Sequence, residues 1–288
     1  MADTASAEVQ GHLQDYWVTD LLGTGARSEI FEIKRRDDGH VFAVKYISAN
    51  DDEDFRVIGH LENEYKVLSE LHDTPGEGAE HIVRPHEFQK VKRFFRVKAA
   101  YLIMDKVEGP TLAEDYDYEL DEILTIFRQI CAGLEHIHKT GYVHADLKPH
   151  NILIDDDLHT TLIDFGFAAP VGEMLESFKG TFGYVAPEQA GGRITEKTDV
   201  FNLGAALYWV LTGQNLPSIM PGDHESHGFV PDERVTIPPP SRVNPEVPEE
   251  LAQMVVQCCS FKEYKRPTVH RLRQYLHGLQ LRLEYGTV

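Results

Sequence analysis

The spacing of apolar residues changes once along the chain, and this change restricts the possible folds more than any other feature. Before about residue 106, short apolar runs alternate with turn signals, which predicts strands near residues 18–22, 30–35, 41–47, 84–93 and 96–106. Beyond residue 111 the intervals become three and four residues, which predicts a long helix through Ile123, Phe127, Ile130, Leu134 and Ile137. The sequence therefore predicts an α+β fold, with a small β-rich lobe followed by a larger, mainly helical lobe.

Two charged residues of the first third are expected in apolar surroundings. Lys45 ends the strand segment Phe42-Ala43-Val44-Lys45, where a lone cation is costly unless it is paired. Glu64 lies on one face of an expected helix together with Val57, Leu61, Leu68 and Leu71. An ion pair between Lys45 and Glu64 explains both positions, and we prefer it to the alternative that Glu64 merely reaches solvent.

The turn between the first two expected strands carries the glycines of a phosphate-binding loop. Its sequence is Gly23-Thr24-Gly25-Ala26-Arg27-Ser28-Glu29-Ile30, with Ser28 at the position where such loops have a third glycine. Glycine lets backbone N–H groups approach an anion without a Cβ atom in the way. The motif alone is weak, because any glycine-bearing hairpin looks similar, and the lysine further along the chain strengthens it.

Composition narrows the function classes. The formal net charge of −19 argues against a nucleic-acid partner, which needs a basic protein surface, and we interpret it as favouring solubility rather than basic substrates. The three cysteines (Cys131, Cys258 and Cys259) match neither a disulfide framework nor a zinc site, and they fit a reducing compartment. Cys258 and Cys259 end an apolar stretch and are expected in the core. The longest apolar run is too short to span a bilayer, and residues 1–10 do not resemble a signal peptide. We therefore expect a cytoplasmic protein with no membrane segment.

The block with the most specific chemistry is His144-Ala145-Asp146-Leu147-Lys148-Pro149-His150-Asn151, followed by Asp164-Phe165-Gly166. Transfer of a phosphoryl group from ATP needs magnesium, which takes hard oxygen ligands, and Asn151 and Asp164 would supply them. Asp146 would orient the attacking hydroxyl and accept its proton, and Lys148 would stabilise charge on the transferred group.

These segments resemble the signature motifs of a eukaryotic-type (Hanks-type) Ser/Thr protein kinase domain. The segment Gly180-Thr181-Phe182-Gly183-Tyr184-Val185-Ala186-Pro187-Glu188 resembles the family's substrate-binding part of the activation segment. Asp199 resembles the aspartate that holds the catalytic loop, and Arg266 the arginine that pairs with Glu188. Lys148 and Thr181 point to the Ser/Thr branch.

The resemblance implies a bilobal protein kinase-like fold that uses ATP and Mg²⁺ on a protein substrate. It implies an N-terminal extension at residues 1–12, an N-lobe at 13–105 and a C-lobe at 106–284, so that one kinase domain spans 13–284. The catalytic residues implied are Asp146, Lys148, Lys45 and Glu64. Met104 would be the gatekeeper, and the nucleotide would also contact Gly23, Gly25, Ser28, Ile30, Ala43, Lys45, Asp105, Val107 and Leu153.

The sequence departs from the family where phosphorylated activation loops are held. Ala145 stands in place of the arginine before the catalytic aspartate, and residues 167–170 lack the second cation that often follows Asp164-Phe165-Gly166. We therefore expect activity without activation-loop phosphorylation. Thr181 is expected to line the active site near Asp146 and Lys148. Ser177 remains the only plausible regulatory hydroxyl, and we do not expect it to be required.

Two other functions fit parts of the sequence. A small-molecule phosphotransferase of the aminoglycoside or choline type shares the catalytic loop and often has a small residue like Ala145, but it lacks a segment such as 180–188. A pseudokinase scaffold usually loses a catalytic or metal-binding residue, whereas Lys45, Asp146, Asn151 and Asp164 are all present. Both remain alternatives to the protein kinase reading.

Overall fold

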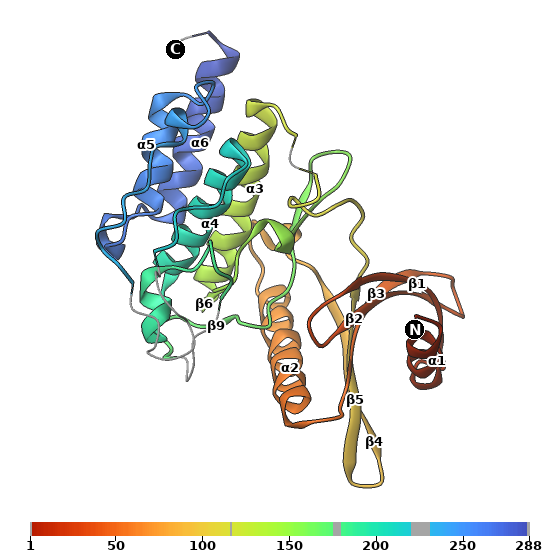
Figure 1. Ribbon diagram of the computed structural model, residues 1–288. Coiled ribbons are helices and arrows are strands. Elements are labelled where there is room, and N and C mark those ends of the chain that lie inside the picture. Colours follow the sequence, from red (N-terminus) through yellow and green to blue (C-terminus); the bar gives the residue numbers. More distant parts are fainter. Residues whose placement is uncertain (1, 116, 175–179, 220–230, 287–288) are drawn as a thin grey trace. The chain divides into compact units, whose positions relative to one another are not determined.

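The β-rich part of the sequence forms one five-stranded antiparallel sheet with the strand order β1-β2-β3-β5-β4 (Figure 1). A glycine with a φ of 74°, Gly39, lies in the turn between the second and third strands. The strands are β1 (Tyr16–Thr24), β2 (Glu29–Arg35), β3 (Val41–Ser48), β4 (Pro85–Arg93) and β5 (Arg96–Asp105). The five strands expected from the sequence are confirmed.

The computed structural model describes residues 2–115, 117–174, 180–219 and 231–286. It divides into an N-terminal unit, made of the residues up to Asp73 and Val83–Glu108, and a C-terminal unit, made of Thr74–Ile82 and the residues from Gly109 onward. The C-terminal unit thus includes a short segment inserted between α2 (Asp52–Asp73) and β4.

Helix α1 (Ala2–His12) covers one face of the sheet, although the sequence analysis assigned no structure to residues 1–12. Val9 and Leu13 are buried against alternate residues of three strands, which by the pleat of a strand point to the same face. These strand residues are Phe31, Ile33, Phe42, Val44, Tyr46, Ala99, Tyr101 and Ile103. Beyond the helix end, Gln10 bonds to the backbone of Leu13, Tyr16 and Val18.

The C-terminal unit is mainly helical, as expected. Its long helices are α3 (Leu120–Lys139), α4 (Glu196–Thr212), α5 (Glu249–Cys258) and α6 (Val269–Glu284). Two short antiparallel ladders join β6 (Tyr142–Val143) to β9 (Ala169–Pro170), and β7 (Ile152–Ile154) to β8 (Thr160–Leu162). Single-turn 3₁₀ helices lie at Ala79–His81, Pro149–Asn151, Pro187–Gly191, Pro240–Arg242 and Glu263–Lys265.

The centre of the C-terminal unit is α4, which is buried on nearly every side. A Cβ atom at Gly204 would lie 2.6 Å from Cys258 Cβ and 2.9 Å from Cys259 Sγ, so glycine is what permits the close approach of α5. All three cysteines are free and buried, which confirms the core positions expected for Cys258 and Cys259. In the described part of the chain, no helix combines the length and apolar character needed to cross a bilayer.

Candidate active site

In the N-terminal unit, Lys45 and Glu64 form the expected ion pair. Lys45 Nζ lies 2.9 Å from Glu64 Oε2, and the side chain of Glu64 is only 1% exposed. Lys45 extends from the face of the sheet opposite to α1, because its strand neighbours Val44 and Tyr46 belong to the core beneath α1. The buried carboxylate is therefore satisfied by a lysine whose position is fixed by the strand.

Other expected nucleotide-binding residues share this face of the sheet. Ile30 is paired across the ladder with Lys45, and Ala43 with Met104, so these four side chains leave the sheet on the same side. Ala43 and Met104 are each 8% exposed. Asp105 ends β5, Val107 follows it in the same unit, and Leu153 lies in β7 of the C-terminal unit.

The glycine-bearing turn joins β1 to β2. The N–H of Gly25 donates to the carbonyl of Ser28 at 2.7 Å, and a Cβ atom at Gly25 would lie 2.7 Å from Ser28 Oγ. At Gly23, by contrast, an added Cβ would have no neighbour within 4 Å. The turn itself therefore needs no glycine at position 23, and at position 25 a Cβ atom would require the Ser28 hydroxyl to rotate away.

In the C-terminal unit, three side chains form a closed set of polar contacts around Asp146. Lys148 Nζ lies 2.7 Å from Asp146 Oδ2 and donates to Thr181 Oγ1 at 2.7 Å. The hydroxyl of Thr181 donates to Asp146 Oδ1 at 2.9 Å. The structure thus brings Thr181 to the place that the sequence analysis expected.

Asn151 supports the same aspartate from the end of the 3₁₀ helix that precedes β7. Its Nδ2 donates to the backbone carbonyl of Asp146 at 2.9 Å and lies 3.4 Å from Asp146 Oδ2. These hydrogen bonds use the nitrogen end of the amide, which leaves the carbonyl oxygen as the atom suited to a cation.

Asp164 adopts a left-handed backbone conformation with a φ of 64°. A non-glycine residue rarely occupies this region, and such strain concentrates at functional sites. The next residue, Phe165, is fully buried, and its ring lies 4.7 Å from that of His144.

The loop that carries Asp146, residues 144–151, is held by Asp199 of α4, which is fully buried. Its two carboxylate oxygens accept the backbone N–H groups of His144 and Ala145, each at 2.9 Å. His138 Nε2 lies 2.8 Å from Asp199 Oδ2 and gives the carboxylate a third partner. The sequence analysis did not identify His138, because its carboxylate partner lies 61 residues away in the sequence.

Ala145 lies in an apolar cluster with Val143, Ala169 and Ile194. It is fully buried and has a φ of 64°. Where the resemblance would place an arginine, the side chain therefore contributes only a methyl group to packing.

Gln189, which the sequence analysis did not identify, joins the activation segment to this loop. Its Nε2 donates to Ala145 O at 2.8 Å, and its Oε1 accepts the N–H of Ala186 at 2.9 Å. Asn202 Nδ2 also lies 3.2 Å from Gln189 Oε1. No motif or spacing in the sequence marks Gln189, because its partners Ala145 and Asn202 come near it only in the folded chain. Ser177, the expected regulatory hydroxyl, lies outside the described residues.

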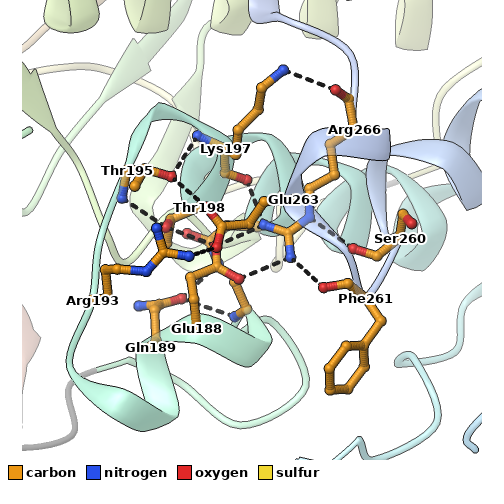
Figure 2. Close-up of polar contacts among 12 residues, drawn as sticks. Glu188, Gln189, Arg193, Thr195, Lys197, Thr198, Ser260, Phe261, Glu263 and Arg266 are labelled. Atoms are coloured by element: carbon orange, nitrogen blue, oxygen red, sulfur yellow. Dashed lines mark hydrogen bonds and ion pairs between the residues drawn. The ribbon is translucent and has the colours of Figure 1, made fainter. Parts of the chain in front are cut away.

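Glu188 and Arg266 form the expected bidentate ion pair (Figure 2). Arg266 Nη1 and Nη2 donate to the two carboxylate oxygens of Glu188 at 2.7 and 2.9 Å, and Thr198 adds its hydroxyl at 2.9 Å. Arg266 also donates to the carbonyls of Ser260 and Lys197, both at 2.8 Å. This network ties the end of the activation segment to α4 and to the loop before α6.

Comparison with known proteins agrees with this arrangement. The family model described as "Protein kinase domain" matches residues 16–277. A serine/threonine-protein kinase A of Synechocystis is 28% identical over 276 residues, which cover 88% of this chain and 50% of the relative. The serine/threonine-protein kinase PrkC of Bacillus subtilis is 34% identical over 177 residues, or 58% of this chain and 26% of the relative.

A eukaryotic relative gives a similar match. The serine/threonine-protein kinase cds1 of Schizosaccharomyces pombe is 28% identical over 228 residues, which cover 73% of this chain and 47% of the relative. The chain thus spans half or less of the length of these three relatives.

Proposed function

Because the chain belongs to the protein kinase domain family, we propose that it transfers the γ-phosphoryl group of ATP to serine or threonine hydroxyls of a protein substrate. The observation that carries this proposal is the set of contacts around Asp146. One oxygen of its carboxylate already accepts a hydroxyl from Thr181, and the other is held by Lys148. The carboxylate is therefore oriented as an acceptor for an alcohol proton.

The residues present fit a magnesium–ATP complex. Asn151 offers a carbonyl oxygen and Asp164 a carboxylate, and both are the hard donors that Mg²⁺ prefers. When bound, Mg²⁺ neutralises the triphosphate and helps to orient it. Gly23, which the turn does not need for steric reasons, fits a place where the backbone must approach a phosphate closely.

We assign each catalytic side chain one task. Asp146 orients the substrate hydroxyl and takes its proton, and Lys148 stabilises negative charge on the transferred group. Lys45, held by Glu64, supplies positive charge to the non-transferred phosphates. Thr181 holds the side chains of Lys148 and Asp146 in their positions until a substrate binds.

We also propose that activity does not require a phosphate on the activation loop. A phosphate needs cations to hold it, and Ala145 offers a buried methyl group instead. An uncharged contact holds the activation segment instead, because the Gln189 amide donates a hydrogen bond to Ala145 O. Replacement of Ser177 by alanine should therefore leave most of the activity intact.

The three cysteines are free and buried, which fits a reducing compartment. We accordingly propose that this part of the protein works in the cytoplasm.

The first experiment is transfer of radiolabelled phosphate from ATP and Mg²⁺ to a panel of generic protein substrates, with unphosphorylated enzyme. Label on serine or threonine that disappears in an Asp146→Asn variant supports the proposal. No transfer to any protein, with ATP still bound, would favour a scaffold without chemistry. Transfer only to small hydroxyl acceptors would favour a small-molecule phosphotransferase.

A further inference from the structure

The turn between β4 and β5 presents two phenylalanines to solvent. Phe94 and Phe95 are 88% and 101% exposed, which makes them the most exposed of the large hydrophobic residues that the structure describes. Figure 1 shows that this turn lies at the far end of the β4–β5 hairpin. Adjacent aromatic side chains exposed to this degree are costly in water and suggest a binding role.

Four cationic residues flank the two phenylalanines in the sequence, although the chain as a whole carries a net charge of −19. They are Lys92, Arg93, Arg96 and Lys98, and residues 90–98 contain no acidic residue. Within the described part of the chain, none of the four takes part in an ion pair, whereas the nearby Lys90 pairs with Glu62 at 2.6 Å. We call residues 92–98 the basic tip.

The basic tip also violates two local rules of hairpin stability. Phe94 has a φ of 58°, a conformation that favours glycine and is rare for an aromatic residue. Arg93 and Arg96 are directly opposed across the ladder, and like charges in that position repel. Neither feature stabilises the unit, so both point to a role outside it.

The tip extends beyond the rest of the sheet. Strand β3 pairs with β5 only as far as Ala99, and the N–H of Ala49 then donates to Lys98 O. The residues between Lys98 and the turn pair only with β4, which at about 3.3 Å per residue gives a projection of roughly 10 Å.

This reach matters because charge interactions fade over short distances. The Debye length is about 8 Å at physiological ionic strength, so the tip acts largely apart from acidic residues at its base. The acidic segment after β3 is itself partly neutralised, since Arg27 binds Asp51 and Asp54 at 3.0 and 2.7 Å.

We propose that the basic tip docks the N-terminal unit on the surface of an anionic phospholipid bilayer. The two rings enter the interface, where aromatic side chains are favoured, and the four cations meet the lipid phosphates around them. A bilayer accepts a convex aromatic apex without a matching cavity, whereas a folded acidic protein would have to supply one. Proteins bind single-stranded nucleic acid in a groove where successive bases stack on aromatic side chains. The two adjacent phenylalanines of the turn form no such groove, which disfavours this partner.

The inference does not rest on the kinase reaction, and its test needs no ATP. The full chain is mixed with sucrose-loaded vesicles of phosphatidylcholine alone, or of phosphatidylcholine with phosphatidylserine, and sedimented. We expect binding only to the vesicles with phosphatidylserine. Each cation replaced by serine should weaken partitioning about fivefold. Phe95→Ser should weaken it roughly tenfold or more.

Two variants protect the test from misfolding. Phe94→Gly removes a ring but suits the positive φ, so it should fold at least as well as the parent and still bind more weakly. Tyr264→Ser removes a 78% exposed aromatic side chain from the C-terminal unit and should leave binding unchanged. Phe95→Trp should show a blue shift of its fluorescence only with anionic vesicles.

The proposal is wrong if both vesicle types bind equally, or if the tip variants bind as tightly as the parent. Soluble poly-glutamate and single-stranded polynucleotide are added as competitors. Binding through the tip to either of these polymers, with no binding to anionic vesicles, would overturn the lipid assignment in favour of that partner class.

Discussion

At the scale of single residues, buried charges set the position of the activation segment. Glu188 and Arg266 are almost completely buried, and every oxygen of the carboxylate has a partner. Such a pair need not add net stability over apolar residues of the same shape, but breaking it leaves a charge without compensation. The stability of the folded unit should therefore fall strongly when either Glu188 or Arg266 is replaced alone.

Glu188→Gln should destabilise the C-terminal unit by about 3–5 kcal/mol, the usual cost of removing one partner from a buried ion pair. The amide keeps the shape but leaves the Arg266 guanidinium with an uncompensated charge. Equilibrium unfolding in urea measures the loss. Glu196→Gln is a matched control, because this residue begins α4 at an exposed-to-intermediate position and has no ion pair within the described residues. Equal effects of the two changes would contradict the argument.

Gln189 holds the loop that carries Asp146 through uncharged hydrogen bonds, which a substitution can remove. In Gln189→Glu an oxygen replaces the nitrogen that donates to Ala145 O, so two acceptors would face each other at 2.8 Å. A buried acceptor left without its donor costs about 1–3 kcal/mol. We expect Gln189→Glu to lower kcat for a peptide more than it raises KM for ATP, because the change disturbs the loop that carries Asp146. An unchanged kcat would show that Gln189 does not position this loop.

At the scale of elements, the sequence predicted the strands and helices well, because their apolar spacing records burial on one face. Helix α1 escaped prediction because Val9 is its one large apolar residue, Leu13 follows the helix end, and its other contacts with the sheet include polar ones of Glu8 and His12 with Tyr46. Periodicity needs several buried residues to be visible, and here the burial depends on a sheet face formed by distant strands.

Helix α1 should nevertheless contribute to the stability of the N-terminal unit. Leu13→Ala removes a side chain that is 2% exposed, and a change of this kind in a core costs about 2–5 kcal/mol. Gly11→Ala, inside the helix that Leu13 directly follows, is the control, since an added Cβ there meets nothing within 4 Å. It should stabilise by roughly 0.5–1 kcal/mol. Thermal unfolding of the two variants should therefore shift in opposite directions.

A similar test applies to the contact between α4 and α5. Gly204→Ala should destabilise the C-terminal unit, because the new Cβ would lie 2.6 Å from Cys258 Cβ on the facing helix. Overpacking of a core typically costs about 1–3 kcal/mol. A second change, Cys259→Ser, relieves only the 2.9 Å contact with Sγ and leaves the Cβ of Cys258 in place, so it should restore at most part of the lost stability. Wild-type stability in Gly204→Ala would mean that the helices can separate freely.

At the scale of the whole molecule, the motifs were predictable because their residue types and order resemble those of the protein kinase domain family, to which the chain belongs. The contacts of Asp146, Lys148 and Thr181 followed from those motifs. His138 and Gln189 did not, because each acts through a backbone or carboxylate partner brought near only by folding. The residues of the motifs can thus be predicted from the sequence, whereas the residues that position them can be identified only from tertiary contacts.

A ligand that binds the folded chain but not the unfolded chain stabilises the folded state. Thermal unfolding therefore tests the binding of ATP and Mg²⁺ without any phosphoryl transfer. At a hundred times its Kd, a ligand stabilises by about 2.7 kcal/mol. We expect ATP with Mg²⁺ to raise the unfolding temperature, and ATP with a chelator to raise it less. In Asp164→Asn the difference between the two should largely disappear, because the amide lacks the negative charge that favours the cation. Lys45→Met should reduce both shifts. The unfolding temperature of the parent could instead rise by the same amount with and without Mg²⁺, and rise equally in Asp164→Asn. That result would contradict the metal-binding role of Asp164 but not nucleotide binding.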